Sequence, residues 1–304
     1  ELAAAGMCGA MVRSHEEWLG HEHGRVVEDL PIVRLTRAGE ADGLDPARFA
    51  SSRPLEGLRV LDLTRVLAGP TCGRTLAALG ADVLTVRAQH LPSVPIFVVD
   101  TGHGKRSTFL DLRDSEDRAR FDGLLADADV LVQGYRPGVM DRLGLGAAEV
   151  MERHPGIVCC WINAYGPEGP WRDRPGWEQL AQSAGGIAHA QGEPGQPALV
   201  PAAASDYTTG YIAAAGVLDA LDRRIREGGS WLVEASLSQT VAWLTRLGPT
   251  VDPAGAVGFG ALDLHETETA DGTLTHLGPG LTIEGLDVGW DRPPPRLGEH
   301  APAW

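Results

Sequence analysis

The sequence is short of positive charge and of long apolar stretches. Its 304 residues include 26 lysines and arginines against 41 aspartates and glutamates, which gives a net charge of -15. Because attraction to nucleic-acid phosphates requires a basic surface, this balance argues against nucleic-acid binding, although a local basic patch can still bind a phosphorylated molecule. No apolar run approaches the ~20 residues that cross a membrane, so we expect no membrane association.

Cysteine pairs are also lacking. The four cysteines are Cys8, Cys72, Cys159 and Cys160, and no two have C-x-x-C spacing. Cys159 and Cys160 are adjacent in an apolar run, so their side chains would point to opposite faces of a strand. We therefore expect four reduced thiols in a cytoplasmic protein. No secretory signal is visible, and the sequence opens on Glu1 rather than Met, as a fragment or a processed chain would.

Several common site signatures are missing. The stretch "TGHGKRS" (101–107) contains a Gly-Lys pair, but Arg106 stands where a phosphate-binding loop needs Ser or Thr. A dinucleotide-binding G-x-G-x-x-G and a nucleophile-elbow G-x-S-x-G are both absent. "HEH" (21–23) offers two histidines without further ligands nearby, so we expect no metal site.

Short apolar runs alternate with helical segments through the middle of the chain. Six runs are typical of buried strands: 58–63, 81–86, 107–112, 129–133, 156–163 and 230–237. Helices are predicted between them, over 69–80, 114–128 and 206–228. Strands that alternate with helices predict an α/β fold with a doubly wound parallel sheet.

The two ends of the chain follow other patterns. Ser14 and Glu17 have the spacing of a capping box, which predicts a short helix. The polar, Gly- and Pro-bearing stretch 34–54 predicts a connector. Polar and apolar residues alternate over 262–277 around Asp271-Gly272, which predicts a hairpin.

One carboxylate stands out in "AAASDYTTGYIAAAG" (202–216). Asp206 lies at the start of a helix whose composition predicts burial, and buried helices rarely contain a charge without a role. Composition alone favours an N-cap, in which free N–H groups and the helix dipole stabilise the ionised form. The surrounding alanines and Gly210 would instead leave space for a bulky ligand.

Several stretches, in a fixed order, resemble the class III CoA-transferases, the CaiB–BaiF family. The resemblance begins with "RPLEGLRVLDLTRVLAGPTCGRTLAALGADVLTV" (53–86) and is nearly continuous to residue 247. It includes "GKRSTFLDLRD", "DVLVQGYRPGVMDRLGLG", "SDYTTGYIAAAGVLDAL" and "GGSWLVEASLSQTVAWL", and the tail adds "PPRLGEHAPAW".

The resemblance implies a Rossmann- or flavodoxin-like large domain, an interlocked homodimer, and an acyl-CoA and a free carboxylic acid as substrates. It implies no permanently bound cofactor, since coenzyme A enters as the substrate thioester. The family's nucleophile falls on Asp206, whose carboxylate would form a mixed anhydride and then an aspartyl-CoA thioester. Motif matches place CoA-binding residues at Leu67, Ala68, Lys105, Arg106 and Arg136, the basic ones facing phosphates.

Three departures from the family pattern keep alternatives open. Trp177 stands where the family's acyl-CoA racemases carry a histidine, which disfavours a racemase. Arg87 stands where an acidic residue is usual. Residues 248–292 are too few for the family's small domain, whereas residues 1–30 resemble its end, so the order looks permuted or the chain derives from a longer fusion. A non-catalytic or partner-dependent subunit is therefore a further alternative.

These patterns divide the chain into three parts. Residues 1–50 would be the end of a small domain and a linker, 51–247 the CoA-binding large domain, and 248–304 a hairpin and a return segment.

Overall fold

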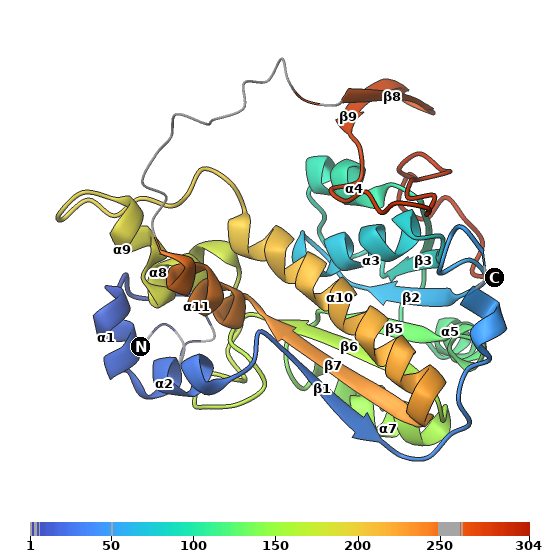
Figure 1. Cartoon of the computed structure of the whole chain (residues 1–304), viewed down its shortest axis with the longest axis horizontal. Helices are drawn as coiled ribbons and strands as arrows, with labels where there is room; N and C mark the ends of the chain where they lie inside the picture. The colour runs from blue at the N-terminus through green and yellow to red at the C-terminus, as the bar shows by residue number, and fades with distance from the viewer. Residues whose placement is uncertain (1, 3–4, 6, 50, 249–261, 263) are drawn as a thin grey trace.

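A seven-stranded sheet forms the centre of the protein (Figure 1). The structure, a computed structural model, describes all residues except 1, 3–4, 6, 50, 249–261 and 263. The strands lie in the order β1-β7-β6-β5-β2-β3-β4. Their bounds are β1 Val33–Ala38, β2 Arg59–Leu63, β3 Asp82–Arg87, β4 Lys105–Phe109, β5 Val130–Gln133, β6 Val158–Asn163 and β7 Ser230–Ser236.

Strands β2 to β7 run parallel, and β1 lies antiparallel on the edge beside β7. Counted from β2, the parallel strands follow the 3-2-1-4-5-6 order of the Rossmann fold. The order reverses between β2 and β5, and α/β proteins bind ligands at the carboxyl ends of the strands at this point.

Helices cover both faces of the sheet, because successive side chains of each buried strand point to opposite faces. Val60 packs into the core under α3 (Ala68–Ala78) and α10 (Ala204–Glu227). Leu61 packs into the second core, under α5 (Ser115–Ala126) and α7 (Ala147–Arg153). Figure 1 shows α10 crossing one face diagonally, with α5 and α7 behind the sheet. One apolar core thus packs on each face of the sheet, and together the two cores position the loops that follow the strands.

Other elements gather at opposite ends of the molecule (Figure 1). One end holds α1 His15–Gly20, α2 Glu22–Asp29, α8 Glu178–Gly185, α9 Ile187–Gln191 and α11 Leu237–Leu247. The other holds α4 Pro95–Gly102 and the hairpin of β8 Leu264–Thr269 and β9 Gly272–Leu277. The short helices η1 Pro46–Phe49 and α6 Val139–Arg142 complete the set.

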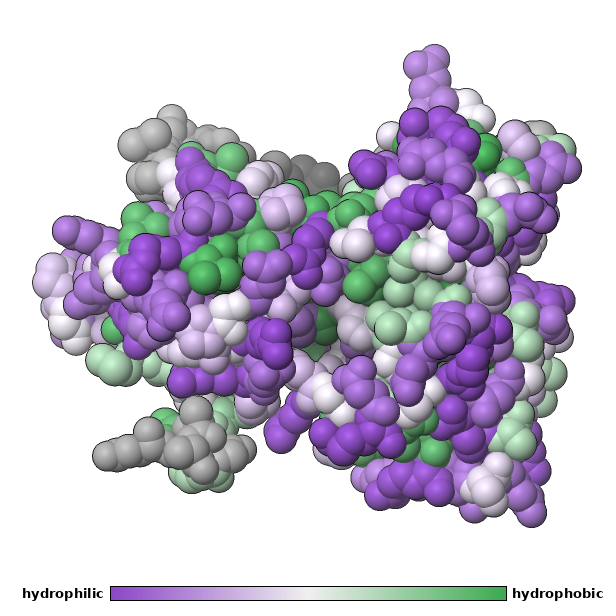
Figure 2. Space-filling model, turned by 90° about the horizontal axis from the view of Figure 1, so that it is seen from below, coloured by the Kyte–Doolittle hydropathy of each residue, from purple (hydrophilic) through white to green (hydrophobic). Residues whose placement is uncertain are grey.

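Seen from below, hydrophilic residues dominate the right half, and apolar patches gather toward the centre and left (Figure 2). Within the described part of the chain, no helix is long and apolar enough to cross a membrane.

Most predicted elements are confirmed, including the Ser14–Glu17 capping box and the hairpin. The connector over 34–54 is wrong at its start, because Val33–Ala38 forms β1. Its polar residues are explained by the edge position, where Arg34 pairs with Glu234 of β7 at 2.8 Å. The strand predicted over 107–112 lies at Lys105–Phe109 instead.

Gly210 has a different purpose from the one that composition predicts. A Cβ at this position would lie 2.5 Å from the Ala68 carbonyl oxygen and 2.6 Å from Thr71 Cβ. The glycine therefore lets α10 pack directly against α3 rather than leaving space for a ligand. This close packing places the start of α10 beside the start of α3.

Candidate functional site

A pocket of about 150 Å³ lies at the carboxyl edge of the sheet, where the strand order reverses. The loop after β2 and the loop after β5 form two of its walls, and residues before α8 form a third. Asp206 is the one carboxylate among the described residues that line it, against three arginines, Arg65, Arg136 and Arg174. The pocket thus combines one buried acid with a positively charged surround.

Asp206 is the third residue of α10 and is 7% exposed. It is not the N-cap, because Ala203 holds that position and contributes no side-chain hydrogen bond. Burial, and then the charge of Glu178, raise the pKa of Asp206 to about 7. The prediction of a helix start that favours the ionised form is therefore wrong, since desolvation outweighs the dipole here.

Glu178 does the capping in place of Asp206. It is 4% exposed, and its Oε2 accepts hydrogen bonds from the Asp206 N–H at 2.6 Å and from Ser205 Oγ at 2.6 Å. Oε1 accepts from the Ser205 N–H at 3.2 Å and from Gln182 Nε2. These four hydrogen bonds fix the backbone of Asp206 at the start of α10 and leave the Asp206 side chain facing the pocket.

The loop between β2 and α3 approaches the pocket in a strained conformation. Val66 has a φ of 71°, which is unfavourable for a β-branched residue. Leu67, the N-cap of α3, supplies no side-chain hydrogen bond to the free N–H groups of the first turn. Strained backbone of this kind is concentrated at functional sites, and an uncapped helix start beside a pocket favours anions.

The structure brings together four of the six residues that the sequence singles out. Leu67, Ala68 and Arg136 line the same pocket as Asp206. Trp177, the residue that replaces the racemase histidine, also lines it and is 48% exposed.

Lys105 lies apart, beneath α3. Its side chain is 3% exposed, and Nζ lies 2.7 Å from Asp62 Oδ2 and donates to the Pro70 carbonyl oxygen, also at 2.7 Å. Burial lowers the pKa of Lys105, and the Asp62 carboxylate opposes that shift. The positive charge of Lys105 is thus paired with a carboxylate of the same chain. Lys105 also lines a second cavity.

Arg106 is also paired. Its Nε and Nη2 donate to the two carboxylate oxygens of Asp82 at 3.0 and 2.6 Å, and Nη1 donates to the Ala303 carbonyl oxygen at 2.5 Å. A bidentate pair of this kind fixes the guanidinium plane. To contact a phosphate, the Arg106 guanidinium group would have to give up part of its pairing with the Asp82 carboxylate.

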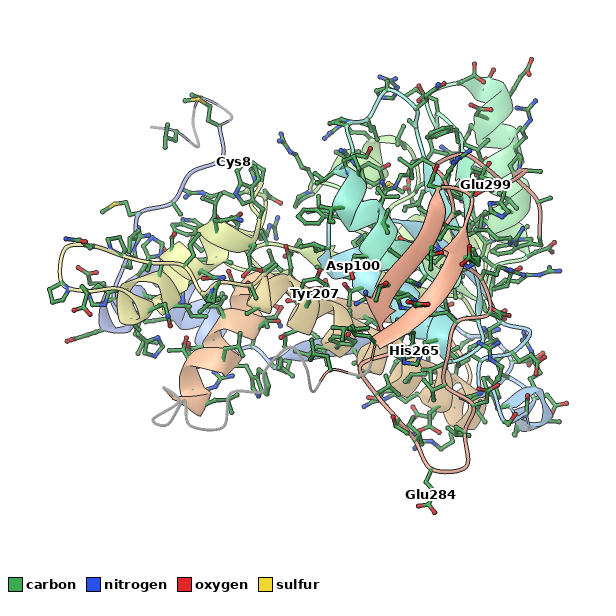
Figure 3. All side chains as sticks on the ribbon, turned by 90° about the horizontal axis from the view of Figure 1, so that it is seen from above. Cys8, Asp100, Tyr207, His265, Glu284 and Glu299 are labelled. Atoms are coloured by element: carbon green, nitrogen blue, oxygen red, sulfur yellow. The ribbon has the colours of Figure 1, made fainter. Side chains whose placement is uncertain are left out.

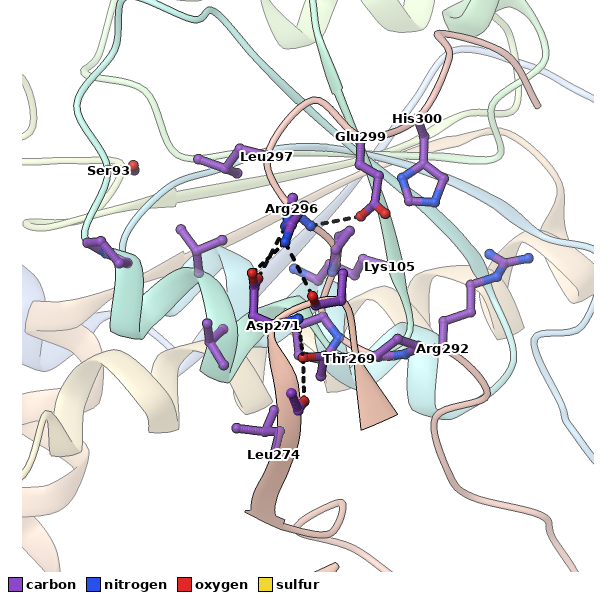
Figure 4. Close-up of a pocket in the computed structure, with 18 of the residues that line it drawn as sticks. Ser93, Lys105, Thr269, Asp271, Leu274, Arg292, Arg296, Leu297, Glu299 and His300 are labelled. Atoms are coloured by element: carbon purple, nitrogen blue, oxygen red, sulfur yellow. Dashed lines mark hydrogen bonds and ion pairs between the residues drawn. The ribbon is translucent and has the colours of Figure 1, made fainter. Parts of the chain in front are cut away.

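The cavity beside Lys105 is the larger one, at about 600 Å³ (Figure 4). Its walls are α4, the hairpin tip and the segment 292–300. Arg296 spans it, with Nη2 2.5 Å from Asp271 Oδ1 and its N–H donating to Glu299 Oε2 at 2.9 Å. It shares no described lining residue with the Asp206 pocket, so the two cavities are separate.

Tyr207 ties the start of α10 to α4. Its hydroxyl donates to Asp100 Oδ2 at 2.8 Å, and Arg74 donates to Asp100 Oδ1 at 2.9 Å. Figure 3 shows Asp100 and Tyr207 facing each other near the centre of the molecule. This bridge holds the residue next to Asp206 in place.

The "HEH" histidines have structural partners. His21 is the N-cap of α2, and its Nδ1 accepts from the His23 N–H at 3.1 Å. His23 donates from Nε2 to the Tyr165 carbonyl oxygen at 2.8 Å and accepts from the Trp171 N–H at 3.2 Å. Among the described residues, no three histidine, cysteine or acidic side chains are placed to hold a metal ion.

Fold and site together define an α/β protein with a buried carboxylate at the sheet's switch point. The family described as CoA-transferase family III matches residues 55–252. The chain belongs to this family. Its resemblance to the CaiB–BaiF type is thereby confirmed, and so is the predicted α/β class.

Curated relatives include an acetyl-coenzyme A transferase, nodX, from Hypoxylon pulicicidum, 38% identical over 80% of this chain and 44% of its own length. The beta subunit of a succinyl-CoA–L-malate CoA-transferase from Chloroflexus aurantiacus is 35% identical over 62% of this chain and 50% of its own. This chain spans about half the length of these relatives.

Solved structures agree on the fold. Rv3272 from Mycobacterium tuberculosis superposes with a TM-score of 0.60 at 31% identity, covering 64% of this chain and 58% of its own. A CAIB/BAIF family protein from Brucella suis gives 0.59 at 28% identity, covering 72% and 65%.

Sequence reasoning missed Glu178 and Arg65 at this edge, and it noted Arg87 only as a departure from the family pattern. Glu178 directly follows Trp177, but nothing local shows that its carboxylate reaches a helix that begins 26 residues later. Arg87 did carry a signal, because it stands where the family usually has an acidic residue.

Proposed function

We propose that this chain transfers coenzyme A from an acyl-CoA to a free carboxylate, with Asp206 as the covalent nucleophile. One observation carries the proposal: Asp206 is buried, is the one acid among the described pocket residues, and has a pKa raised to about 7. A carboxylate of higher pKa is a stronger nucleophile, yet it remains substantially ionised near neutrality.

The reaction proceeds by exchange of acyl bonds. An oxygen of Asp206 attacks the thioester carbonyl carbon, the C–S bond breaks, and CoA leaves as the thiolate. The thiolate attacks the Asp206 carbonyl carbon of the anhydride, which releases the first acid as a carboxylate and leaves an aspartyl-CoA thioester. The acceptor carboxylate then attacks that thioester and expels the thiolate. The thiolate finally attacks the acceptor's acyl carbon, giving the new acyl-CoA and free Asp206.

Pocket residues supply what these steps require. Each attack creates an oxyanion, and the uncapped N–H groups at the start of α3, at Ala68 and Gly69, are the proposed donors. Ile162, Ala164 and Leu237 add apolar wall, which limits water that would hydrolyse the anhydride. Glu178 holds the Asp206 backbone during each change of bond.

CoA contacts are proposed first for Leu67, Ala68 and Arg136, which share the pocket with Asp206. For Lys105 and Arg106, phosphate contact stays a prediction that requires them to loosen the pairs with Asp62 and Asp82. No cofactor need be held permanently. The homodimer that the family resemblance implies, and the cytoplasmic location that the cysteines indicate, remain parts of the proposal.

The proposal is tested with a panel of acyl-CoAs and free acids, followed by mass spectrometry of products and of the intact protein. We expect new acyl-CoAs and a CoA adduct on the chain. Product formation without any covalent adduct during turnover would contradict the mechanism. Running the panel in heavy water also tests the racemase alternative: Trp177 has a donor but no basic lone pair, so we expect no enzyme-dependent deuterium uptake at the α-carbon.

A further inference from the structure

The starts of α3 and α10 carry the two halves of the proposed chemistry. Asp206 lies in the first turn of α10, whose N-cap, Ala203, makes no side-chain hydrogen bond. Leu67, the N-cap of α3, makes none either. The attacking carboxylate and the N–H groups proposed to bind the oxyanion therefore lie on two separate helices. Each step of the reaction requires that these helices keep one alignment.

Apolar packing brings the two helices close together. Gly210 of α10 packs so closely on the start of α3 that a Cβ there would lie 2.5 Å from the Ala68 carbonyl oxygen. Apolar contact has no preferred direction, whereas a hydrogen bond does. Polar contacts between the helices are therefore the interactions that can fix how far they slide and rotate against each other.

Asp100 of α4 supplies such contacts, because its two carboxylate oxygens bind different helices. Oδ2 accepts a hydrogen bond from the Tyr207 hydroxyl of α10 at 2.8 Å. Oδ1 accepts one from Arg74 Nη1 of α3 at 2.9 Å, and the same nitrogen donates to the Asp100 carbonyl oxygen at 2.9 Å. These three residues form the Asp100 bridge, which joins the residue after the nucleophile to the helix of the proposed oxyanion donors.

Arg74 anchors the bridge on α3. It is buried, and its guanidinium carbon lies 5.7 Å from the centre of the Trp290 ring and 6.0 Å from that of the Tyr207 ring. The carbonyl oxygen of Arg74 accepts a hydrogen bond from Trp290 Nε1 at 3.1 Å. Two aromatic rings thus hold the cation in place, and the bonds it shares with Asp100 are strengthened by charge.

We propose that Asp100 and Tyr207 are positioning residues for the transfer reaction. Through Arg74, their bridge keeps the Asp206 carboxylate aligned with the N–H groups at the start of α3. No residue of the bridge is among the described residues that line the Asp206 pocket, so the bridge acts through alignment rather than by contact with substrate. The proposal rests on the proposed function for the reaction itself.

The test compares Tyr207→Phe with the wild type in the assay with acyl-CoAs and free acids. This substitution removes the hydroxyl and keeps the ring beside Arg74. We expect kcat to fall about tenfold, as the loss of a hydrogen bond to a charged group would produce. The KM for acyl-CoA and the final amount of CoA adduct per chain should not change. Tyr211→Phe, one turn further along α10, is the matched control and should keep the wild-type kcat.

A double variant tests whether the bridge acts as one unit. Tyr207→Phe combined with Asp100→Ala should be no slower than Asp100→Ala alone, because either change breaks the same connection. Asp100→Asn should recover part of the activity that Asp100→Ala loses. Its amide oxygen can accept from Arg74, and its amide nitrogen can donate to the Tyr207 hydroxyl.

Four results would overturn the proposal. The first is an equal kcat in Tyr207→Phe and wild type, and the second is an equal fall in Tyr211→Phe. The third is a set of losses that multiply in the double variant. The fourth is a lower activity that comes entirely from a smaller amount of adduct per chain or a higher KM, because the bridge would then maintain the fold or binding alone.

Amide hydrogen exchange separates this proposal from the proposed function, since it requires no turnover. In Tyr207→Phe we expect faster exchange at the start of α10 and unchanged exchange in α5. Faster exchange there, with no transfer by the wild type, means that the alignment stands and the proposed function falls. Transfer through Asp206 with unchanged exchange and unchanged kcat in Tyr207→Phe means that the proposed function stands and the bridge falls.

Discussion

Two sets of buried charges flank the start of α3, and they differ in how they are paired. Asp62 and Lys105 are 0% and 3% exposed, and each satisfies the other and a neighbouring polar group. Asp206 and Arg87 are also buried, at 7% exposed each, yet neither has an opposite charge as a hydrogen-bonded partner among the described residues.

The difference in pairing distinguishes charges that stabilise the fold from charges that remain available to a ligand. A complete buried pair holds elements together, here β2, β4 and the first turn of α3, and can contact a ligand only if the pair loosens. An incomplete one keeps its charge available at the cost of folding free energy, as reactive groups commonly do. The four predictions that follow are ordered from the largest expected effect to the smallest.

Removing the unpaired acid should abolish chemistry. Asp206→Asn keeps the shape but cannot form the anhydride, so we expect the transfer rate to fall by several orders of magnitude. The control is Asp219→Asn on the exposed side of the same helix, which should transfer normally. An Asp206→Asn protein that transfers at the wild-type rate, without deamidation, would remove the basis of the comparison.

Breaking the complete pair should instead unfold the protein. Lys105→Met leaves Asp62 charged and buried, and we expect the free energy of unfolding to drop by about 3–5 kcal/mol. Arg106→Met breaks the neighbouring, more exposed pair with Asp82 and should cost at most about 1 kcal/mol. Urea denaturation measures both. Equal losses in the two variants would show that the buried pair has no special structural role.

These contrasts mark what the sequence can and cannot predict. Apolar runs and their spacing predict the parallel strands, because burial on both faces requires continuous hydrophobic segments. The family motifs predict Asp206. The pairing of buried charges cannot be predicted in this way. Asp62 and Lys105 are 43 residues apart in the sequence. The hydrogen bonds between Glu178 and the start of α10 form only when α8 and α10 pack together. The edge strand β1 was missed because its partner, β7, lies almost 200 residues away.

Stability should depend on pH through Asp206. Its folded pKa of about 7 exceeds the ordinary 3.8, so the folded state binds the proton more tightly. Its contribution to stability is therefore complete below pH 3.8 and is lost as pH rises through 7. Relative to wild type, the free energy of unfolding of Asp206→Asn should rise by about 3 kcal/mol as the pH is raised from 5 to 8. Thermal or urea unfolding at both pH values measures this, and a difference that does not change with pH would contradict the raised pKa.

The smallest effect concerns Glu178, whose charge is the lesser of the two causes that raise the Asp206 pKa. In Glu178→Gln we expect the acidic limb of kcat/KM to move to lower pH, since ionised Asp206 is the reactive form. We also expect about a tenfold lower kcat, because an amide nitrogen replaces one acceptor at the start of α10.

Ser205→Ala is the matched control for that variant. It removes one donor to Glu178 but keeps both carboxylates, so its acidic limb should stay in place. A limb that moves equally in both variants would assign the shift to packing rather than to charge.

The central claim is that Asp206 becomes acylated. Incubation with an acyl-CoA and hydroxylamine, followed by peptide mass spectrometry, tests it directly, because hydroxylamine converts an activated aspartyl carbonyl into a hydroxamate. The account predicts the hydroxamate on Asp206, dependent on acyl-CoA and absent from Asp206→Asn. Turnover with the label on Glu178, or with no labelled carboxylate, would contradict it.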